Sequence, residues 1–123
     1  MTQSTYVVVA VDDDRRVRES VQSVLESAGY DTETFETAEA FLSSGAVARA
    51  RCAILDVRLP GMDGLELQRR VRKERPGLPV IFVTAHDDDE IRQQALADGA
   101  EAFVVKPFDA ADLIALIEVA VAQ

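Results

Sequence analysis

Four apolar runs of this sequence each end at a polar side chain that can do chemistry. The side chains are Asp12 and Asp13 after 6–11, Asp56 after 52–55, Thr84 after 80–83 and Lys106 after 102–105. Short runs rich in Val and Ile are typical of strands buried on both faces. If the strands are parallel, their carboxyl ends meet at one edge of the sheet, where open α/β sheets bind ligands. We therefore expect three carboxylates, a hydroxyl and an ammonium group in one cleft.

Crowding Asp12, Asp13 and Asp56 into one cleft has an electrostatic cost. Two like unit charges about 4 Å apart repel by about 4 kcal/mol at an effective dielectric constant near 20. Lys106 offsets part of this charge, and a divalent cation would neutralise the rest. Oxygen ligands select Mg²⁺, Mn²⁺ or Ca²⁺ over zinc or copper, and Mg²⁺ keeps several waters where protein carboxylates are few. The sequence predicts a Mg²⁺ site, with Mn²⁺ as the alternative ion.

The same groups predict phosphoryl transfer to a carboxylate. Aspartate is an accepted phosphoryl acceptor and forms an acyl phosphate. Lys106 and the metal ion would bind the phosphoryl oxygens on which charge develops, and the Thr84 hydroxyl would donate to another. The alternative for Asp12, Asp13 and Asp63 is a structural role as helix caps, which we favour for Asp63 alone.

Composition and charge limit the function further. The 123 residues fit one domain, and 48% apolar with 28% charged residues describe a globular protein. A net charge of −9 argues against nucleic-acid binding by this domain, because phosphate contacts need clustered Lys and Arg. The single cysteine, Cys52, is expected in the core. No signal-peptide pattern and no apolar stretch of roughly 18 residues occurs, so we expect a cytoplasmic protein without a membrane partner.

Helix-like patterns alternate with the strand-like runs. Helices are predicted at 14–28, 38–43, 63–74, 87–98 and from 109 onward, from helical spacing of apolar residues, capping residues and closing glycines. The mostly polar segment 32–35 is typical of an edge strand. The acidic residues 87–90 complement the positive end of a helix dipole, a reading we favour over metal binding.

This alternation predicts an α/β fold, a (βα)5 doubly wound parallel sheet with right-handed crossovers. The flavodoxin-like strand order 2-1-3-4-5 would make the first and third strands neighbours. Asp12 and Asp13 would then lie beside Asp56.

At these residues the sequence resembles the receiver domain of two-component response regulators, over essentially its whole length. The matching segments are 11–14 (VDDD), 55–64 (LDVRLPGMDG), 83–85 (VTA) and 105–108 (VKPF). Each motif is weak alone, but their order and helix-sized gaps are highly specific. Segments 37–42 (TAEAFL) and 84–87 (TAHD) are further similar to the FixJ-type subgroup. Its members usually carry a C-terminal DNA-binding domain, whereas we expect residues 1–123 to form the receiver domain alone.

The resemblance implies a role for each residue of the cleft. Asp56 would be the phosphoacceptor. Asp13 and Asp56 would coordinate Mg²⁺ directly, together with the backbone carbonyl of Arg58, and Asp12 would act through metal-bound water. Lys106 would bind the phosphoryl group.

The resemblance also implies a conformational switch. Thr84 and Phe103 match the family's switch pair, in which the hydroxyl moves to the phosphoryl group and the aromatic ring turns inward. Simple core packing stays open as the alternative for Phe103. The bond between Lys106 and Pro107 is expected to be cis. For His86, at the rim of the cleft, a surface role and an influence on dephosphorylation both stay open.

The function that the resemblance implies is signalling by a phosphoacceptor domain that is not a metabolic enzyme. A sensor histidine kinase would donate the phosphoryl group to Asp56, and hydrolysis would remove it. Phosphorylation would switch a surface for homodimerisation or effector control, with transcriptional regulation by the full-length protein and DNA contacts only through another domain.

Two rival functions come from other classes. A phosphorylation-independent interaction domain would not need all of the cleft residues. An Asp-nucleophile phosphatase typically needs a second Asp two residues after the nucleophile, and this position is Arg58.

For the homodimer, we expect helix 87–98 to provide the contact surface. Its spacing turns Ile91, Ala95 and Leu96 inward and leaves Gln93 and Ala97 outside. These outer residues are small or uncharged, so a second copy could pack there without burying an unpaired charge.

Overall fold

A five-stranded parallel sheet forms the centre of the molecule in residues 6–122, which are the residues that this computed structural model describes. The strand order is β2-β1-β3-β4-β5, and all neighbouring strands are parallel. The strands are β1 (Val7–Val11), β2 (Thr32–Phe35), β3 (Ala50–Leu55), β4 (Val80–Thr84) and β5 (Ala102–Val105). The predicted fold class and strand order are confirmed.

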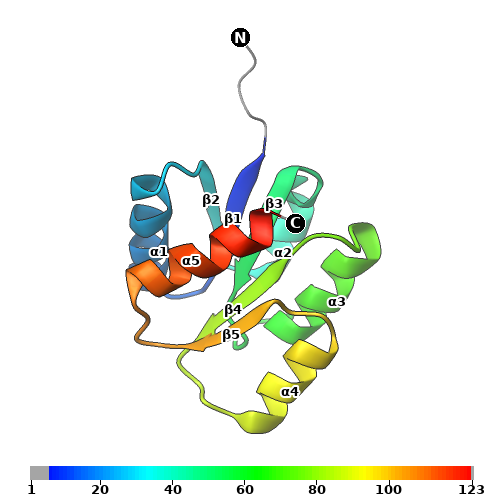
Figure 1. The fold of residues 1–123 in the computed structure, drawn as a ribbon. Helices are drawn as coiled ribbons and strands as arrows, with labels where there is room; N and C mark the ends of the chain where they lie inside the picture. Colours follow the sequence, from blue (N-terminus) through cyan, green and yellow to red (C-terminus); the bar gives the residue numbers. More distant parts are fainter. Residues whose placement is uncertain (1–5, 123) are drawn as a thin grey trace.

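Helices cover both faces of the sheet (Figure 1). Helices α1 (Arg15–Ser27) and α5 (Ala110–Val121) lie side by side on one face. The other face carries α2 (Ala38–Ser43), α3 (Gly64–Glu74) and α4 (Asp89–Ala97). A 3₁₀ helix, η1 (Ala46–Arg49), precedes β3 and was not predicted. Within the described residues, no helix is long and apolar enough to cross a bilayer.

Side chains of the inner strands alternate between two apolar cores, because successive residues of a strand point to opposite faces. Val8 and Ile54 pack in a core with Leu25 of α1 and Leu113 of α5. The neighbouring strand positions face the opposite core, with α2, α3 and α4; they include Val9, Val11, Ala53, Leu55 and Phe82. Strands buried on both faces explain the continuous apolar runs of the sequence. Cys52 lies in the first of these cores, as predicted.

Two expectations about burial are wrong. Strand β5 lies at the edge of the sheet, so residues 102–105 are half-buried and not enclosed on both faces. On α4, Ala95 is buried and Ile91 is half-buried as predicted, but Leu96 points outward with 44% of its surface exposed. Leu96 follows Ala95 directly and therefore sits about 100° further around the helix, beyond the narrow buried stripe.

Side-chain caps set the helix starts. The capping residues, each accepting a hydrogen bond from a backbone N–H two or three residues on, are Asp14, Thr37, Asp63, Asp88 and Asp109. The capping role of Asp63 is confirmed. Helix α4 begins later than predicted, because the Asp88 carboxylate accepts from the N–H groups of Glu90 and Ile91 and so occupies the N-cap position.

Candidate functional site

The carboxyl ends of four strands bring the predicted polar residues together. The Lys106 ammonium bridges two carboxylates, with Nζ 2.9 Å from Asp12 Oδ2 and 3.4 Å from Asp56 Oδ2. Thr84 is the last residue of β4, and its carbonyl accepts from the Lys106 N–H at 2.7 Å. Asp12, Asp56 and Thr84 are buried. Residues 94 positions apart, Asp12 and Lys106, thus meet because of the strand order.

Three carboxylates of this site can hold a metal ion. Asp12, Asp13 and Asp56 each offer one oxygen, and these oxygens all lie within 4.8 Å of one another. Asp13 is exposed, whereas the other two are buried. The donor set consists of oxygen only, which fits a hard divalent cation and leaves room for waters or a phosphate oxygen on the solvent side. The Arg58 N–H lies 3.4 Å from Asp56 Oδ1, while a metal-binding role for its carbonyl stays a prediction.

Burial and charge act against each other in this cluster. Burial raises the pKa of Asp12; the hydrogen bonds from the Asp14 N–H and from Lys106 oppose this, and the charge of Asp56 adds to it. Burial alone would lower the pKa of Lys106, but the carboxylates of Asp12 and Asp56 outweigh it, so that the pKa is raised. The ammonium group is therefore held in its charged form between carboxylates that repel one another. A bound cation would relieve the repulsion that Lys106 leaves.

Backbone contacts fix the loop that carries Asp12 and Asp13. Asp12 Oδ1 accepts from the Asp14 N–H at 2.9 Å. The Asp12 carbonyl accepts from Arg18 Nη1 at 2.8 Å. Arg18 was missed by the sequence analysis; its position one turn into the helix that follows the acidic motif was the available signal.

Close backbone packing fixes the loop after Asp56. The Gly64 N–H donates to the Val57 carbonyl at 2.8 Å, and a Cβ at position 64 would collide with the Asp56 carbonyl oxygen. Only glycine allows this approach of α3 to the Asp56 backbone. Glu39 of α2 accepts from the Met62 N–H at 2.9 Å and so attaches the same loop to α2. The sequence analysis predicted neither contact.

The predicted switch residues lie beside the cleft. The buried Thr84 Oγ1 accepts from the His86 N–H at 3.2 Å, and the His86 side chain is exposed. Phe103 is half-buried, and its ring centroid lies 6.1 Å from that of Phe82. Both interpretations of Phe103, switch or core residue, are compatible with this position. The Lys106–Pro107 peptide bond, expected to be cis, is cis.

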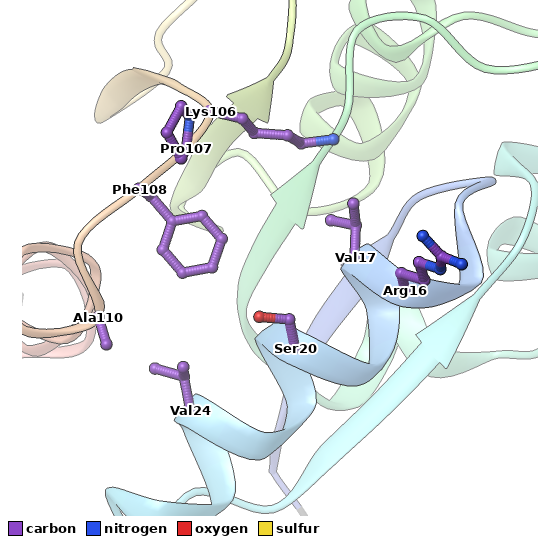
Figure 2. Close-up of a pocket in the computed structure, with 8 residues that line it drawn as sticks. All are labelled: Arg16, Val17, Ser20, Val24, Lys106, Pro107, Phe108 and Ala110. Carbon is purple, nitrogen blue, oxygen red and sulfur yellow. The ribbon is translucent and has the colours of Figure 1, made fainter.

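A groove of about 390 Å³ opens next to the site, between α1 and the segment that leads into α5 (Figure 2). The Phe108 ring projects toward Ser20 of α1 in this groove. Its lining is mostly apolar but includes one charged residue from α1, Arg16, and one that directly follows β5, Lys106. The lining residues are Arg16, Val17, Ser20, Val24, Lys106, Pro107, Phe108 and Ala110. Because Lys106 belongs to both, the groove adjoins the carboxylate cluster.

Comparisons with known proteins agree with this geometry. The family model described as response regulator receiver domain matches residues 8–118. The transcriptional regulatory protein FixJ of Bradyrhizobium diazoefficiens is 37% identical over 123 residues, a match that covers 100% of this chain and 60% of FixJ. The DNA-binding transcriptional regulator NtrC of Escherichia coli is 37% identical over 117 residues, covering 95% of this chain and 25% of NtrC.

A solved structure shares the fold over nearly the whole chain. The BeF3-activated receiver domain of DrrB, a Thermotoga maritima protein, has a TM-score of 0.88 at 31% identity, and the match covers 96% of this chain and 98% of that one. The sequence thus spans 60% of FixJ and 25% of NtrC, but nearly all of a solved receiver domain.

Proposed function

The chain belongs to the response regulator receiver domain family, and on that premise we propose that it accepts a phosphoryl group at Asp56 in a Mg²⁺-dependent reaction. The observation that carries this proposal is the Lys106 ammonium, which lies between the buried carboxylates of Asp12 and Asp56. The ammonium group is in place to stabilise charge on a phosphoryl group attached to Asp56. The choice of Asp56 over Asp12 as the acceptor rests on family membership, because Lys106 contacts both carboxylates.

In the proposed reaction an Asp56 carboxylate oxygen attacks phosphorus. The new bond joins this oxygen to phosphorus, and the bond from phosphorus to the donor's leaving group breaks. Lys106 neutralises phosphoryl oxygens as the donor departs, and the Thr84 hydroxyl donates to another of these oxygens. Hydrolysis of the acyl phosphate later restores the carboxylate.

Asp13, Asp56 and the Arg58 carbonyl would hold Mg²⁺, with Asp12 acting through a metal-bound water. The ion supplies positive charge next to the transferred group, which is its general part in phosphoryl transfer. The cluster fits such an ion because its oxygens lie within 4.8 Å of one another and Lys106 offsets only part of their charge. Mn²⁺ has the same ligand preference and is the alternative.

The proposed phosphoryl donor is a sensor histidine kinase. A donor histidine must reach Asp56 from outside the carboxyl edge of the sheet, and there the apolar groove beside Lys106 is the adjoining surface (Figure 2). A protein donor can bury apolar side chains in the groove while its phosphohistidine faces the cluster. Such contacts would distinguish a kinase from a small phosphodonor.

The proposed output is a phosphorylation-dependent change of the α4 surface through Thr84 and Phe103. Gln93 and Ala97 are exposed on this helix as predicted, and the exposed Leu96 adds apolar area next to them. We propose weak homodimerisation through this surface. FixJ and NtrC are named as transcriptional regulators, so regulation of transcription is the proposed role of a full-length protein, with DNA contacts made outside this domain.

Phosphorylation by acetyl phosphate tests the chemistry. With Mg²⁺ and acetyl phosphate, intact mass spectrometry should show one added phosphoryl group, which peptide mapping places at Asp56. Asp56→Asn should abolish the addition, whereas Asp63→Asn should keep it, because Asn caps a helix as well as Asp does. Uptake without a divalent metal, or uptake that survives in Asp56→Asn, would contradict the proposal.

A further inference from the structure

The guanidinium group of Arg92 lies over the ring of Phe103. Its Cζ atom is 5.1 Å from the ring centroid, a distance at which a cation is attracted by the face of an aromatic ring. The ring also contacts Phe82, with 6.1 Å between centroids. Phe103 is therefore held between the sheet and a charged residue of α4.

Arg92 is also connected to the segment that follows Thr84. Arg92 Nη2 donates to Asp87 Oδ1 at 3.0 Å. Asp87 follows His86, whose N–H donates to Thr84 Oγ1 at 3.2 Å. Two hydrogen bonds and one cation–π contact thus join the Thr84 hydroxyl to the Phe103 ring on a path outside the sheet.

This arrangement has favourable and unfavourable parts. The Arg92 Nε atom is buried and finds no hydrogen-bond acceptor among the described residues. A buried donor without an acceptor destabilises the conformation that contains it, whereas the contact with the ring stabilises it. Helix α4 itself is lightly held, since Ala95 is the single buried residue within 89–97. A small movement of Asp87 can therefore shift the equilibrium between the conformation in which Arg92 lies over the Phe103 ring and one in which it does not.

We propose that Arg92 is a positioning residue for the Thr84–Phe103 switch. Its guanidinium holds the Phe103 ring in the described position, and Asp87 transmits movement of residues 85–87, the Thr84 loop, to Arg92. The inference rests on the proposed function, because a phosphoryl group at Asp56 is what draws the Thr84 hydroxyl away from the His86 N–H. Movement of residues 85–87 then displaces the Asp87 carboxylate, Arg92 withdraws, and the ring is free to turn.

Beryllofluoride, which imitates the phosphoryl group, gives the test. The protein is labelled with 4-fluorophenylalanine and titrated with beryllofluoride in Mg²⁺, and the Phe103 signal in the ¹⁹F NMR spectrum is assigned from Phe103→Leu. On this proposal Arg92 stabilises only the described conformation, in which the Phe103 ring has not turned. Arg92→Gln should therefore lower the beryllofluoride concentration at the midpoint of the titration by about two- to fivefold, which is the effect of one exposed cation–π contact. The Phe103 signal of free Arg92→Gln should also move toward its position in the beryllofluoride-bound protein.

Three variants serve as controls. Arg70→Gln removes the same charge from an exposed ion pair on α3 and should leave both the midpoint and the Phe103 signal unchanged. Arg92→Lys keeps a cation over the ring and should lie between wild type and Arg92→Gln. In a Phe103→Leu background, Arg92→Gln should not change the midpoint of the titration any further, because the ring that Arg92 contacts is gone. The signals of the other labelled phenylalanines report the midpoint in this background.

The outcomes separate this inference from the proposed function. An unchanged or raised midpoint in Arg92→Gln overturns the role of Arg92 while the wild-type response still supports phosphoryl binding. An effect of Arg92→Gln that persists fully in the Phe103→Leu background also overturns it. A wild-type protein that does not respond to beryllofluoride and Mg²⁺ sinks the proposed function and the role of Arg92 together.

Discussion

Asp13→Asn should make the metal-free protein more stable and remove its response to Mg²⁺. The carboxylate oxygens of Asp12, Asp13 and Asp56 lie within 4.8 Å of one another, so each pair of charges would repel by at least about 3.5 kcal/mol at an effective dielectric constant near 20. Asp13 is exposed, however, and water reduces its interactions toward about 1 kcal/mol or less. We therefore expect a gain of about 1 kcal/mol, or about 3 to 5 °C in melting temperature for a chain of this size.

Thermal unfolding with and without Mg²⁺ measures both effects. Wild type should melt at a higher temperature in Mg²⁺, because the ion binds the folded cluster and the unfolded chain holds no preformed site. At a Mg²⁺ concentration about 100 times the dissociation constant, the gain is about 2.7 kcal/mol. Asp13→Asn should start from the higher metal-free melting temperature and gain little from Mg²⁺.

Asp14→Asn is the matched control for this prediction. It removes a neighbouring negative charge outside the cluster, and Asn preserves the N-cap of α1. Its Mg²⁺ response should equal that of wild type. An Asp13→Asn protein with an unchanged Mg²⁺ response would show that the ion binds elsewhere, and a lowered metal-free stability would show that carboxylate repulsion does not dominate the cluster.

Two further predictions concern groups away from the cluster. Burial raises the pKa of the Cys52 thiol to about 12, so a disulfide reagent at pH 8 should react at a negligible rate with the native protein and rapidly after unfolding in urea; fast reaction of the native protein would contradict its burial. The hydrogen bonds from Arg49 lower the pKa of Glu33, so this pair stabilises the fold above the ordinary Glu pKa and loses its effect as pH falls through the lowered value. The stability difference between wild type and Arg49→Gln should accordingly be largest near neutral pH and vanish in acid, and a difference that grew in acid would refute the assignment.

The sheet could be predicted from the sequence because strands enclosed on both faces leave an unmistakable apolar run. The alternation with helices indicated parallel strands, and the flavodoxin-like strand order then explains why Lys106 meets Asp12 across 94 residues of sequence. The edge strand β5 carries an equally apolar run although its residues are half-buried, so apolarity alone overestimated its burial. The 3₁₀ helix η1 has no side-chain cap, and therefore offered no start signal.

Contacts between side chains and loops were beyond the sequence pattern. Glu39 reaches the Met62 N–H and Arg92 reaches the Phe103 ring, and both depend on where α2 and α4 lie against the sheet. Periodicity fixes the face of a helix only to within a residue or two at the edge of the buried stripe, which is why Leu96 was placed on the wrong side. The strand ends were different, because a backbone register alone brings them together.

The same carboxylate repulsion connects the parts of this site. The fold holds Asp12 and Asp56 buried beside one ammonium group, an arrangement that costs stability while negative charge remains in excess. In the proposed function, a cation would relieve this excess charge, and a phosphoryl group at Asp56 would then restore an excess of negative charge next to Thr84. The Thr84 hydroxyl ends a buried strand and accepts from the His86 N–H at 3.2 Å, so it is well placed to turn toward that phosphoryl group. On this proposal, metal binding and phosphorylation would both change the charge balance of the cluster, and residues 85–87 would be the first part of the fold to respond to that change.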